Sequence, residues 1–215
     1  EFDVACGRWS NGGETTRRGP PRECCAKCKD EGLVWRRLAQ QFCYTSPKHR
    51  TLAAIAAWAR KELDGHADDP RPALYSRAAL ERAETASPLW NAAQRSYVRD
   101  GYMHNAMRML WGKAVLQWTS DYSAALTILE QLNNKYSLDG RDPNSYAGIQ
   151  WIFGKFDRPS YRSPIYGTGS YMSLQAVEET CGVQAYTEKR GIGGCEGRGQ
   201  TPRRGGEPER REEGR

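Results

Sequence analysis

Two segments of the chain, residues 101–111 and 138–144, must meet in the folded protein. The first has the pattern of an amphipathic helix and carries Arg108 among Met, Leu and Trp, and the second is a loop dense in Asp, Gly and Asn. An arginine on an apolar helix face needs an anion, because an unpaired buried charge is very costly. The loop supplies Asp139 and Asp142. A lone arginine on a helix is more often solvated, but the length of this paired pattern favours packing of the loop against the helix.

Composition divides the chain into a foldable middle and two polar ends. Of the 215 residues 38% are hydrophobic, and the shortfall is concentrated in residues 1–30 and 187–215, which are rich in Gly, Arg and Glu. Such segments cannot bury enough apolar surface to offset their ordering entropy. We therefore expect residues 187–215 to be disordered, and residues 1–30 to be either disordered or a mispredicted gene start. Residues 31–186 are long enough to form one core.

The charge and cysteine patterns exclude little. A net charge of +6 is a mild preference for polyanions and equally fits an ordinary basic protein. Cys24, Cys25 and Cys28 cluster, but the second ligand pair of a structural zinc site is missing, so we expect no metal. The role of this cluster stays open.

The hydropathy of the chain and its N-terminal residues indicate whether it enters a membrane or is secreted. The sequence has no apolar run long enough to span a bilayer and no secretory signal. We therefore expect no association with membranes. The chain does not begin with Met, so we expect its true start to be absent. The compartment, nucleus or organelle, stays open.

Helical periodicity predicts an all-α fold, and no alternating strand pattern or repeat is present. The first expected helix has Leu33, Leu38 and Phe42 near one face. Ser87 and Pro88 form a helix start, and Gly101 follows a helix end. Residues 137–146 are expected to form a polar loop. The expected helices are 31–43, 52–64, 76–84, 88–99, 103–118, 121–135 and 146–154.

Three tryptophans have a spacing that fits two different roles. Trp111 and Trp118 are seven residues apart, which places them on one helix face about 10 Å apart along the axis. A third ring could sit between them, and Trp90 opens the preceding helix. On spacing alone, three core tryptophans are the simpler interpretation.

Six segments carry a resemblance to a known family. Residues 31–174 resemble the C-terminal part of the flavin domain of class II cyclobutane pyrimidine dimer photolyases, in the photolyase/cryptochrome family. The order and spacing of all six segments fit. The segments are 34–43, 88–94, 103–111, 116–118, 132–144 and 162–172.

The resemblance implies a light-driven DNA-repair lyase, a deoxyribodipyrimidine photo-lyase that uses flavin adenine dinucleotide (FAD). In this family the reduced flavin donates an electron to a pyrimidine dimer in UV-damaged DNA, after the damaged bases have flipped out of the duplex. The protein holds the flavin, excludes water and positions the lesion. A monomer is expected.

The resemblance also assigns residues to the flavin. Arg108 and Asp139 are expected to form an ion pair beside the flavin ring, with Asp139 accepting from the ring N–H edge. Asn133 is expected near the flavin nitrogen that gains a proton on reduction. Asp142 and Asn144 are expected to touch the cofactor or to fix its loop.

For electron transfer and the lesion, the resemblance assigns further residues. Trp111, Trp90 and Trp118, in that order from flavin to surface, match the family's electron relay. The residues expected at the lesion are Trp35 and Trp151 as aromatic walls, Met109 as lining, Arg162 as a DNA contact, and Glu31 as a hydrogen-bond partner that stabilises the dimer radical anion.

Several departures from the family pattern suggest a fragment. The N-terminal antenna domain and the first half of the flavin domain, with its phosphate-binding loop, have no counterpart here, so we expect the chain alone to repair dimers poorly. Ser170 replaces a common Arg, and Asn105 replaces a common Gly. Two alternatives remain: a cryptochrome-like photoreceptor without repair activity, and an inactive truncated product.

Overall fold

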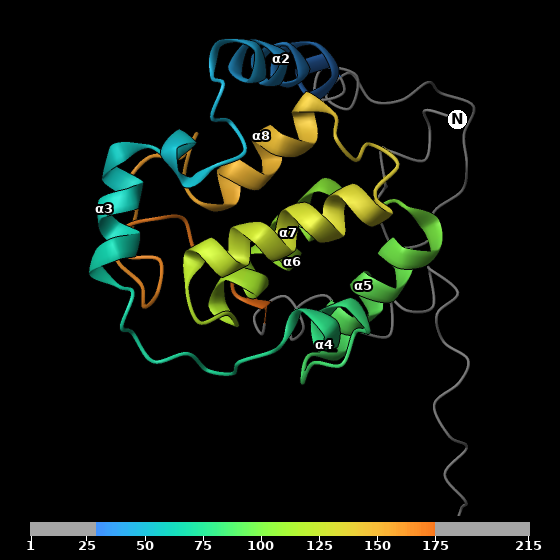
Figure 1. The fold of residues 1–215 in the computed structure, drawn as a ribbon, viewed down its shortest axis with the longest axis vertical. Coiled ribbons are helices and arrows are strands. Elements are labelled where there is room, and N and C mark those ends of the chain that lie inside the picture. The colour runs from blue at the N-terminus through green and yellow to red at the C-terminus, as the bar shows by residue number, and fades with distance from the viewer. Residues whose placement is uncertain (1–28, 175–215) are drawn as a thin grey trace, which may run out of the picture.

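A computed structural model describes residues 29–174, in which helices joined by turns and irregular loops make up the fold (Figure 1). Among them the backbone forms no strand, only one isolated antiparallel bridge between Ser163 and Gly167. The predicted all-α class is confirmed. The helical elements are η2 (Asp30–Trp35), α2 (Arg36–Thr45), η3 (Leu52–Ala54), α3 (Ala57–Gly65), α4 (Arg77–Glu81), α5 (Pro88–Asp100), α6 (Asn105–Gln117), α7 (Tyr122–Tyr136) and α8 (Pro143–Ile152).

Some expectations fall outside these residues. The Cys24, Cys25 and Cys28 cluster and both polar ends are not described, so the division at residues 31 and 186 stays a prediction. Within residues 29–174, no group of side chains is arranged to hold a metal ion. No helix in the same range is both long enough and apolar enough to cross a bilayer.

Local signals set both ends of α5. The Ser87 hydroxyl accepts a hydrogen bond from the Trp90 N–H at 3.1 Å, and Pro88 occupies the first helical position. At the other end Gly101 adopts a left-handed conformation with φ of 67°, and its N–H donates to the Tyr97 carbonyl. The predicted start and stop of this helix are confirmed.

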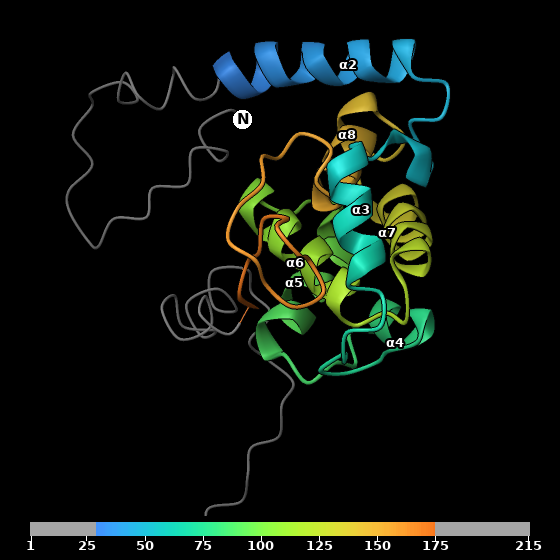
Figure 2. The same ribbon diagram turned by 90° about the vertical axis from the view of Figure 1, so that its left-hand side faces the viewer.

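Helix α6 forms the centre of the core, with α5, α7 and α8 packed around it (Figures 1 and 2). Gly112 lies where α6 meets α8, and a Cβ atom built there would collide with Ile152. The missing side chain therefore allows the two helices to approach closely. Trp90 and Trp111 are among the largest fully buried side chains.

Helix α2 lies across α8 at one edge of the molecule (Figure 2). Ala39 and Phe42 are buried there, whereas Leu33 is 64% exposed and Leu38 is 41% exposed. The expectation that Leu33, Leu38 and Phe42 share one packed face was wrong. Leu33 lies in the π-helix η2, whose wider turn changes the direction of its side chains relative to those of α2.

Two other helix boundaries differ from the prediction. The segment expected as one helix at 52–64 is a short 3₁₀ turn, η3, followed by α3. Helix α8 begins at Pro143 rather than at residue 146, because Asp142 caps it and Pro143 is preorganised for a first turn. The polar loop is thus shorter, residues 137–142.

Candidate active site

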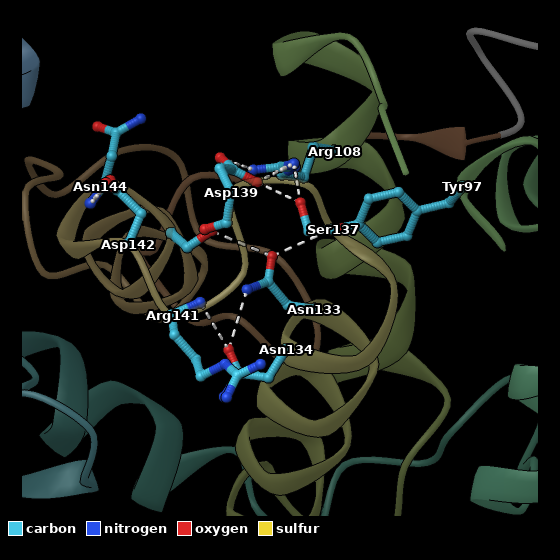
Figure 3. A network of polar contacts seen from close by, with 10 residues as sticks. Tyr97, Arg108, Asn133, Asn134, Ser137, Asp139, Arg141, Asp142 and Asn144 are labelled. Atoms are coloured by element: carbon cyan, nitrogen blue, oxygen red, sulfur yellow. Dashed lines mark hydrogen bonds and ion pairs between the residues drawn. The ribbon is translucent and has the colours of Figure 1, made fainter. Parts of the chain in front are cut away.

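Arg108 and Asp139 form a two-pronged ion pair between α6 and the loop after α7 (Figure 3). The guanidinium donates to both carboxylate oxygens, each at 2.9 Å, and also to the Ser137 hydroxyl at 2.8 Å. This parallel geometry is the strongest arrangement of an arginine and a carboxylate. The contact expected from the sequence is present, and it is Asp139 rather than Asp142 that makes it.

Backbone contacts hold the acidic loop against the start of α6. The Leu138 N–H donates to the Gly101 carbonyl at 3.0 Å, which ties the loop to the turn between α5 and α6. Ser137 donates a short hydrogen bond to Asp139. The Asp139 carboxylate is therefore held by Ser137 of its own loop as well as by Arg108.

Electrostatics keep both partners of the pair charged. Burial by itself raises the pKa of Asp139, but the hydrogen bonds and charge of Arg108 outweigh it and hold that pKa below its ordinary value. Burial acts on Arg108 in the opposite sense, and Asp139 again outweighs it, so the pKa of Arg108 is raised. The pair remains ionic across the physiological pH range.

One atom of this pair has no partner in the described part of the chain. The Arg108 Nε–H is buried and unpaired among residues 29–174, although the other guanidinium nitrogens are bonded. Leaving a buried donor unpaired carries a desolvation cost. The hydrogen-bonding capacity of this N–H is thus unused within the described part of the chain.

Asn133 is buried beside the pair and belongs to a polar network (Figure 3). Its Oδ1 accepts a hydrogen bond from the Tyr97 hydroxyl at 3.0 Å, and its amide nitrogen lies 3.4 Å from the Asn134 Oδ1. The Arg108 guanidinium stacks over the Tyr97 ring at 5.5 Å. Asn133 therefore lies next to the ion pair, one ring away from Arg108.

Asp142 and Asn144 have local roles at the start of α8. The Asp142 carboxylate accepts the Asn144 backbone N–H at 2.8 Å as the helix cap, and its other oxygen lies 3.8 Å from Arg36. The Asn144 side chain points away from the network (Figure 3). Of the two alternatives for Asp142, fixing the loop is the one that its contacts match.

The three tryptophans of interest form a ladder in the expected order. Trp90 lies between the others: its ring centroid is 6.2 Å from Trp111 with planes only 6° apart, and 5.6 Å from Trp118 in an edge contact. The exposed fractions are 0% for Trp90, 1% for Trp111 and 8% for Trp118. The expectation that Trp90 fills the gap between the other two is confirmed.

Residues of α5 connect this ladder to the ion pair. The Tyr97 ring contacts Trp111 edge-on at 5.7 Å, while its other face meets Arg108. The Trp111 indole N–H donates to the Gln94 side chain at 2.9 Å. An unbroken series of buried aromatic rings thus runs from the Arg108–Asp139 pair to Trp118.

Trp35 and Trp151 form a second aromatic pair, where η2 meets α8. Their centroids are 4.8 Å apart and their planes are tilted by 31°. The indole N–H of Trp35 donates to Asp30 at 3.1 Å, and that of Trp151 donates to Asp157 at 2.5 Å. Rings this close leave no room for a base between them, so together they offer one tilted stacking surface.

Lys113 is buried on the face of α6 that meets α8. Its ammonium donates to the Ile152 carbonyl at 2.7 Å, lies 4.0 Å from Asp157, and sits 5.5 Å from the centre of the Tyr166 ring. Desolvation lowers its pKa to about 8, and the nearby Asp157 only partly opposes this. A small cavity adjoins Lys113 and Tyr166, on the α3 side of α6 and away from Arg108.

The remaining expected residues are placed as follows. Met109 is half-buried against the core. The Arg162 side chain is 69% exposed and lies 3.8 Å from Glu62. Glu31 lies within η2, but its side chain is outside the described part of the structure.

Sequence reasoning missed Tyr97, Ser137, Lys113 and Asp157 and gave Gln94 no role. A signal existed for two of them: Trp90, Gln94 and Tyr97 are spaced i, i+4 and i+7, which places them on one face of α5. Asp157 had no comparable signal, because its partners Trp151, Ser170 and Lys113 follow no regular spacing along the chain.

The chain is 43% identical over 158 residues to a deoxyribodipyrimidine photo-lyase of Oryza sativa subsp. japonica, with 73% of this chain aligned. The chain belongs to the photolyase family. Photo-lyases of Methanothermobacter thermautotrophicus and Arabidopsis thaliana are 38% and 42% identical, over 78% and 73% of this chain.

The match covers only part of each photolyase relative. The aligned region spans 31%, 38% and 32% of those three proteins, about a third of their length. No family model matches the chain. Ser170, one of the two residues that depart from the family pattern, donates a hydrogen bond to Asp157 at 2.5 Å.

Proposed function

We propose that this chain is the flavin-ring and lesion-binding part of a light-driven DNA-repair enzyme, a class II photolyase that splits cyclobutane pyrimidine dimers. The observation that carries the proposal is the tryptophan ladder joined through Tyr97 to the Arg108–Asp139 pair. Closely packed indoles that lead away from a buried charged site suit electron transfer. The photolyase relatives supply the reaction class.

The residues beside Arg108 fit a flavin. Bound FAD supplies the light-excited electron donor of the reaction. Asp139 offers a carboxylate acceptor to the N–H edge of the ring, and the unpaired Arg108 Nε–H offers a donor. Asn133 adds an amide close to the Arg108–Asp139 pair. Because the amide is neutral, it offers hydrogen bonds to the flavin without changing the net charge beside it.

The ladder gives this chain a route for electrons. Trp111 is nearest to the ion pair, Trp90 stacks on it, and Trp118 is the most exposed of the three. An electron lost at Trp111 is replaced from Trp90 and then from Trp118. The positive charge thereby moves from Trp111 to Trp118, away from the buried ion pair.

The tilted pair of Trp35 and Trp151 supports repair over a photoreceptor role. A flipped dimer presents flat pyrimidine faces, and aromatic side chains stack on such faces at about 1–3 kcal/mol per base. Asp30 and Asp157 fix the two indoles in place. We assign Met109 to the lesion site beside this stacking surface, Arg162 to the DNA backbone and Glu31 to the dimer itself.

Flavin binding tests the cofactor assignment. The 215-residue chain is produced in flavin-replete cells and its visible absorption is recorded, next to Arg108→Met and the control Arg141→Met, which removes an exposed arginine from the loop that carries Asp139. We expect a structured flavin spectrum for the unmodified chain and the control, and loss of flavin for Arg108→Met. A colourless chain, or equal flavin in all three, contradicts the assignment.

Photoreduction and DNA binding test the other two parts. In flavin-loaded protein with an external reductant, Trp90→Phe should slow light-driven flavin reduction by at least tenfold. Trp58→Phe, which replaces a tryptophan of α3 outside the ladder, should leave the rate unchanged.

For the lesion site, Trp151→Leu should abolish the preference for a single-stranded oligonucleotide with one thymine dimer over its undamaged counterpart. Unchanged rates or unchanged preference would count against those assignments.

A further inference from the structure

Gln94 is a fully buried side chain of α5 that binds the indole N–H of Trp111. Gln94 is 0% exposed and Trp111 is 1% exposed, and Trp111 Nε1 donates to Gln94 Oε1 at 2.9 Å. A carboxamide in an apolar core is costly unless its polar atoms are bonded. An apolar side chain of similar size would fill this space without that requirement.

Two contacts fix which way the amide points. Gln94 Nε2 faces the backbone carbonyl of Glu81 at 3.4 Å, and a carbonyl can only accept a hydrogen bond. The indole N–H of Trp111 can only donate. Both contacts require the oxygen of Gln94 to face Trp111.

The chemistry of this contact changes when Trp111 loses an electron. The resulting indole cation radical is a far stronger acid at Nε1–H than the neutral indole. A carboxylate or a water molecule in contact would take that proton, whereas a carboxamide oxygen is too weak a base. Its dipole also places partial negative charge against the cation, an effect that is larger in a low-dielectric interior.

Among the residues that the structure describes, the contacts of Trp111 offer the proton no other nearby base. Trp90 donates its own indole N–H to the backbone carbonyl of Trp111 at 3.1 Å, which is another very weak base. Tyr97 packs on Trp111, and burial raises the pKa of its phenol, so it stays neutral. The charged groups on this side, Arg108 and Asp139, lie beyond the Tyr97 ring.

We propose that Gln94 is a positioning residue that keeps the indole proton on Trp111 while an electron passes along the ladder. The inference rests on the proposed electron relay. One electron leaves Trp111 to a one-electron acceptor, one moves from Trp90 to Trp111, and one moves from Trp118 to Trp90. No proton moves at Trp111 or Trp90, so the positive charge is not trapped as a neutral radical and continues to Trp118.

The hydrogen bond is tested first, without flavin or DNA. Indole N–H signals of the ¹⁵N-labelled chain are recorded by NMR, and Trp111→Phe identifies the Trp111 signal. Gln94→Leu should shift this signal upfield and speed its hydrogen exchange by at least tenfold. The matched control is Gln150→Leu, which removes an equally buried amide whose hydrogen bonds go to the carbonyls of His49 and Thr51, and it should leave the signal in place.

The proton is tested next, by ultraviolet flash photoionisation of the flavin-free chain with ferricyanide as scavenger of the ejected electron. Trp90→Phe isolates Trp111 from the ladder, and subtraction of Trp90→Phe/Trp111→Phe leaves the Trp111 radical. Cation and neutral tryptophan radicals differ in visible absorption, the cation absorbing at longer wavelength. With Gln94 in place we expect the cation from pH 6 to pH 10, and with Gln94→Glu a change to the neutral radical as the new carboxyl ionises.

The outcomes separate this inference from the proposed function. A neutral Trp111 radical with Gln94 present, or a cation at every pH with Gln94→Glu, overturns the inference whether or not the chain binds flavin. A colourless chain whose Trp111 radical keeps its proton supports the role of Gln94 and contradicts only the cofactor assignment.

Discussion

Replacing Lys113 by Met should change how stability depends on pH. Lys113 is 1% exposed, and burial lowers its pKa to about 8 in the folded chain, against 10.5 for an ordinary lysine. Multiplying the difference between these pKa values by about 1.4 kcal/mol for each unit gives about 3.5 kcal/mol, the cost of keeping the ammonium charged in the core.

The sign of the pH effect follows from proton binding. Below pH 8 both the folded and the unfolded chain carry the proton on Lys113, and the full cost is present. Between pH 8 and 10.5 only the unfolded chain binds it, so the free energy of unfolding rises with pH. From pH 7 to pH 10 the contribution of Lys113 amounts to a gain of about 2.5 kcal/mol.

Other groups act in the opposite direction at alkaline pH. Burial raises the pKa of Cys43, Tyr97 and Tyr166 in the folded chain, so their deprotonation lowers stability as pH rises. These groups are common to the unmodified chain and to Lys113→Met. The difference in unfolding free energy between the two proteins therefore isolates the contribution of Lys113.

The assay is urea unfolding followed by far-ultraviolet circular dichroism from pH 7 to pH 10. The stability of the unmodified chain minus that of Lys113→Met should rise by about 2.5 kcal/mol across this range. Lys61→Met, which removes an exposed lysine of α3, should give a flat difference. The absolute change at pH 7 also includes the lost hydrogen bond to Ile152, so only the slope is diagnostic. A flat difference for Lys113→Met would refute the reasoning.

Three substitutions test the packing and caps by the same urea assay at pH 7. Gly112→Ala drives a Cβ atom into Ile152 and should cost about 1–3 kcal/mol; an unchanged midpoint would mean that α6 and α8 are not in close contact. Ser87→Ala removes the acceptor of the Trp90 N–H and should cost about 1 kcal/mol, and a stabilised variant would contradict the cap. Gly101→Ala forces a side chain into a left-handed conformation and should cost about 1–2 kcal/mol, whereas a gain in stability would exclude that conformation.

The parts of the fold that depend on local signals could be predicted from the sequence. Ser87 and Pro88 start α5 and Gly101 ends it through interactions within a single turn, so neighbouring residues contain the necessary information. The contact between Arg108 and the acidic loop was also predictable, because a cation on an apolar helix requires an anion, and the family resemblance selected Asp139 over Asp142.

Features that depend on tertiary packing could not be predicted. Leu33 and Leu38 have the spacing of a packed face, but how much of it α8 covers is decided by the π-turn and the helix crossing. Asp157 gains its importance from Trp151, Ser170 and Lys113, which converge on it from α8, the following loop and α6. No pattern along the chain shows such a convergence.

Asp142 ends the loop and caps α8, so this helix separates the loop from Trp151 by a fixed length and a fixed rotation about the helix axis. Asp139 lies three residues before the cap, and Trp151 lies nine residues after it, about 14 Å along the helix axis. Because each residue of an α-helix also turns by about 100°, insertion or deletion of one residue between Asp142 and Trp151 would rotate the indole away from Trp35 while leaving the ion pair intact. The number of residues in α8 therefore sets the distance between the Arg108–Asp139 pair and the Trp35–Trp151 pair.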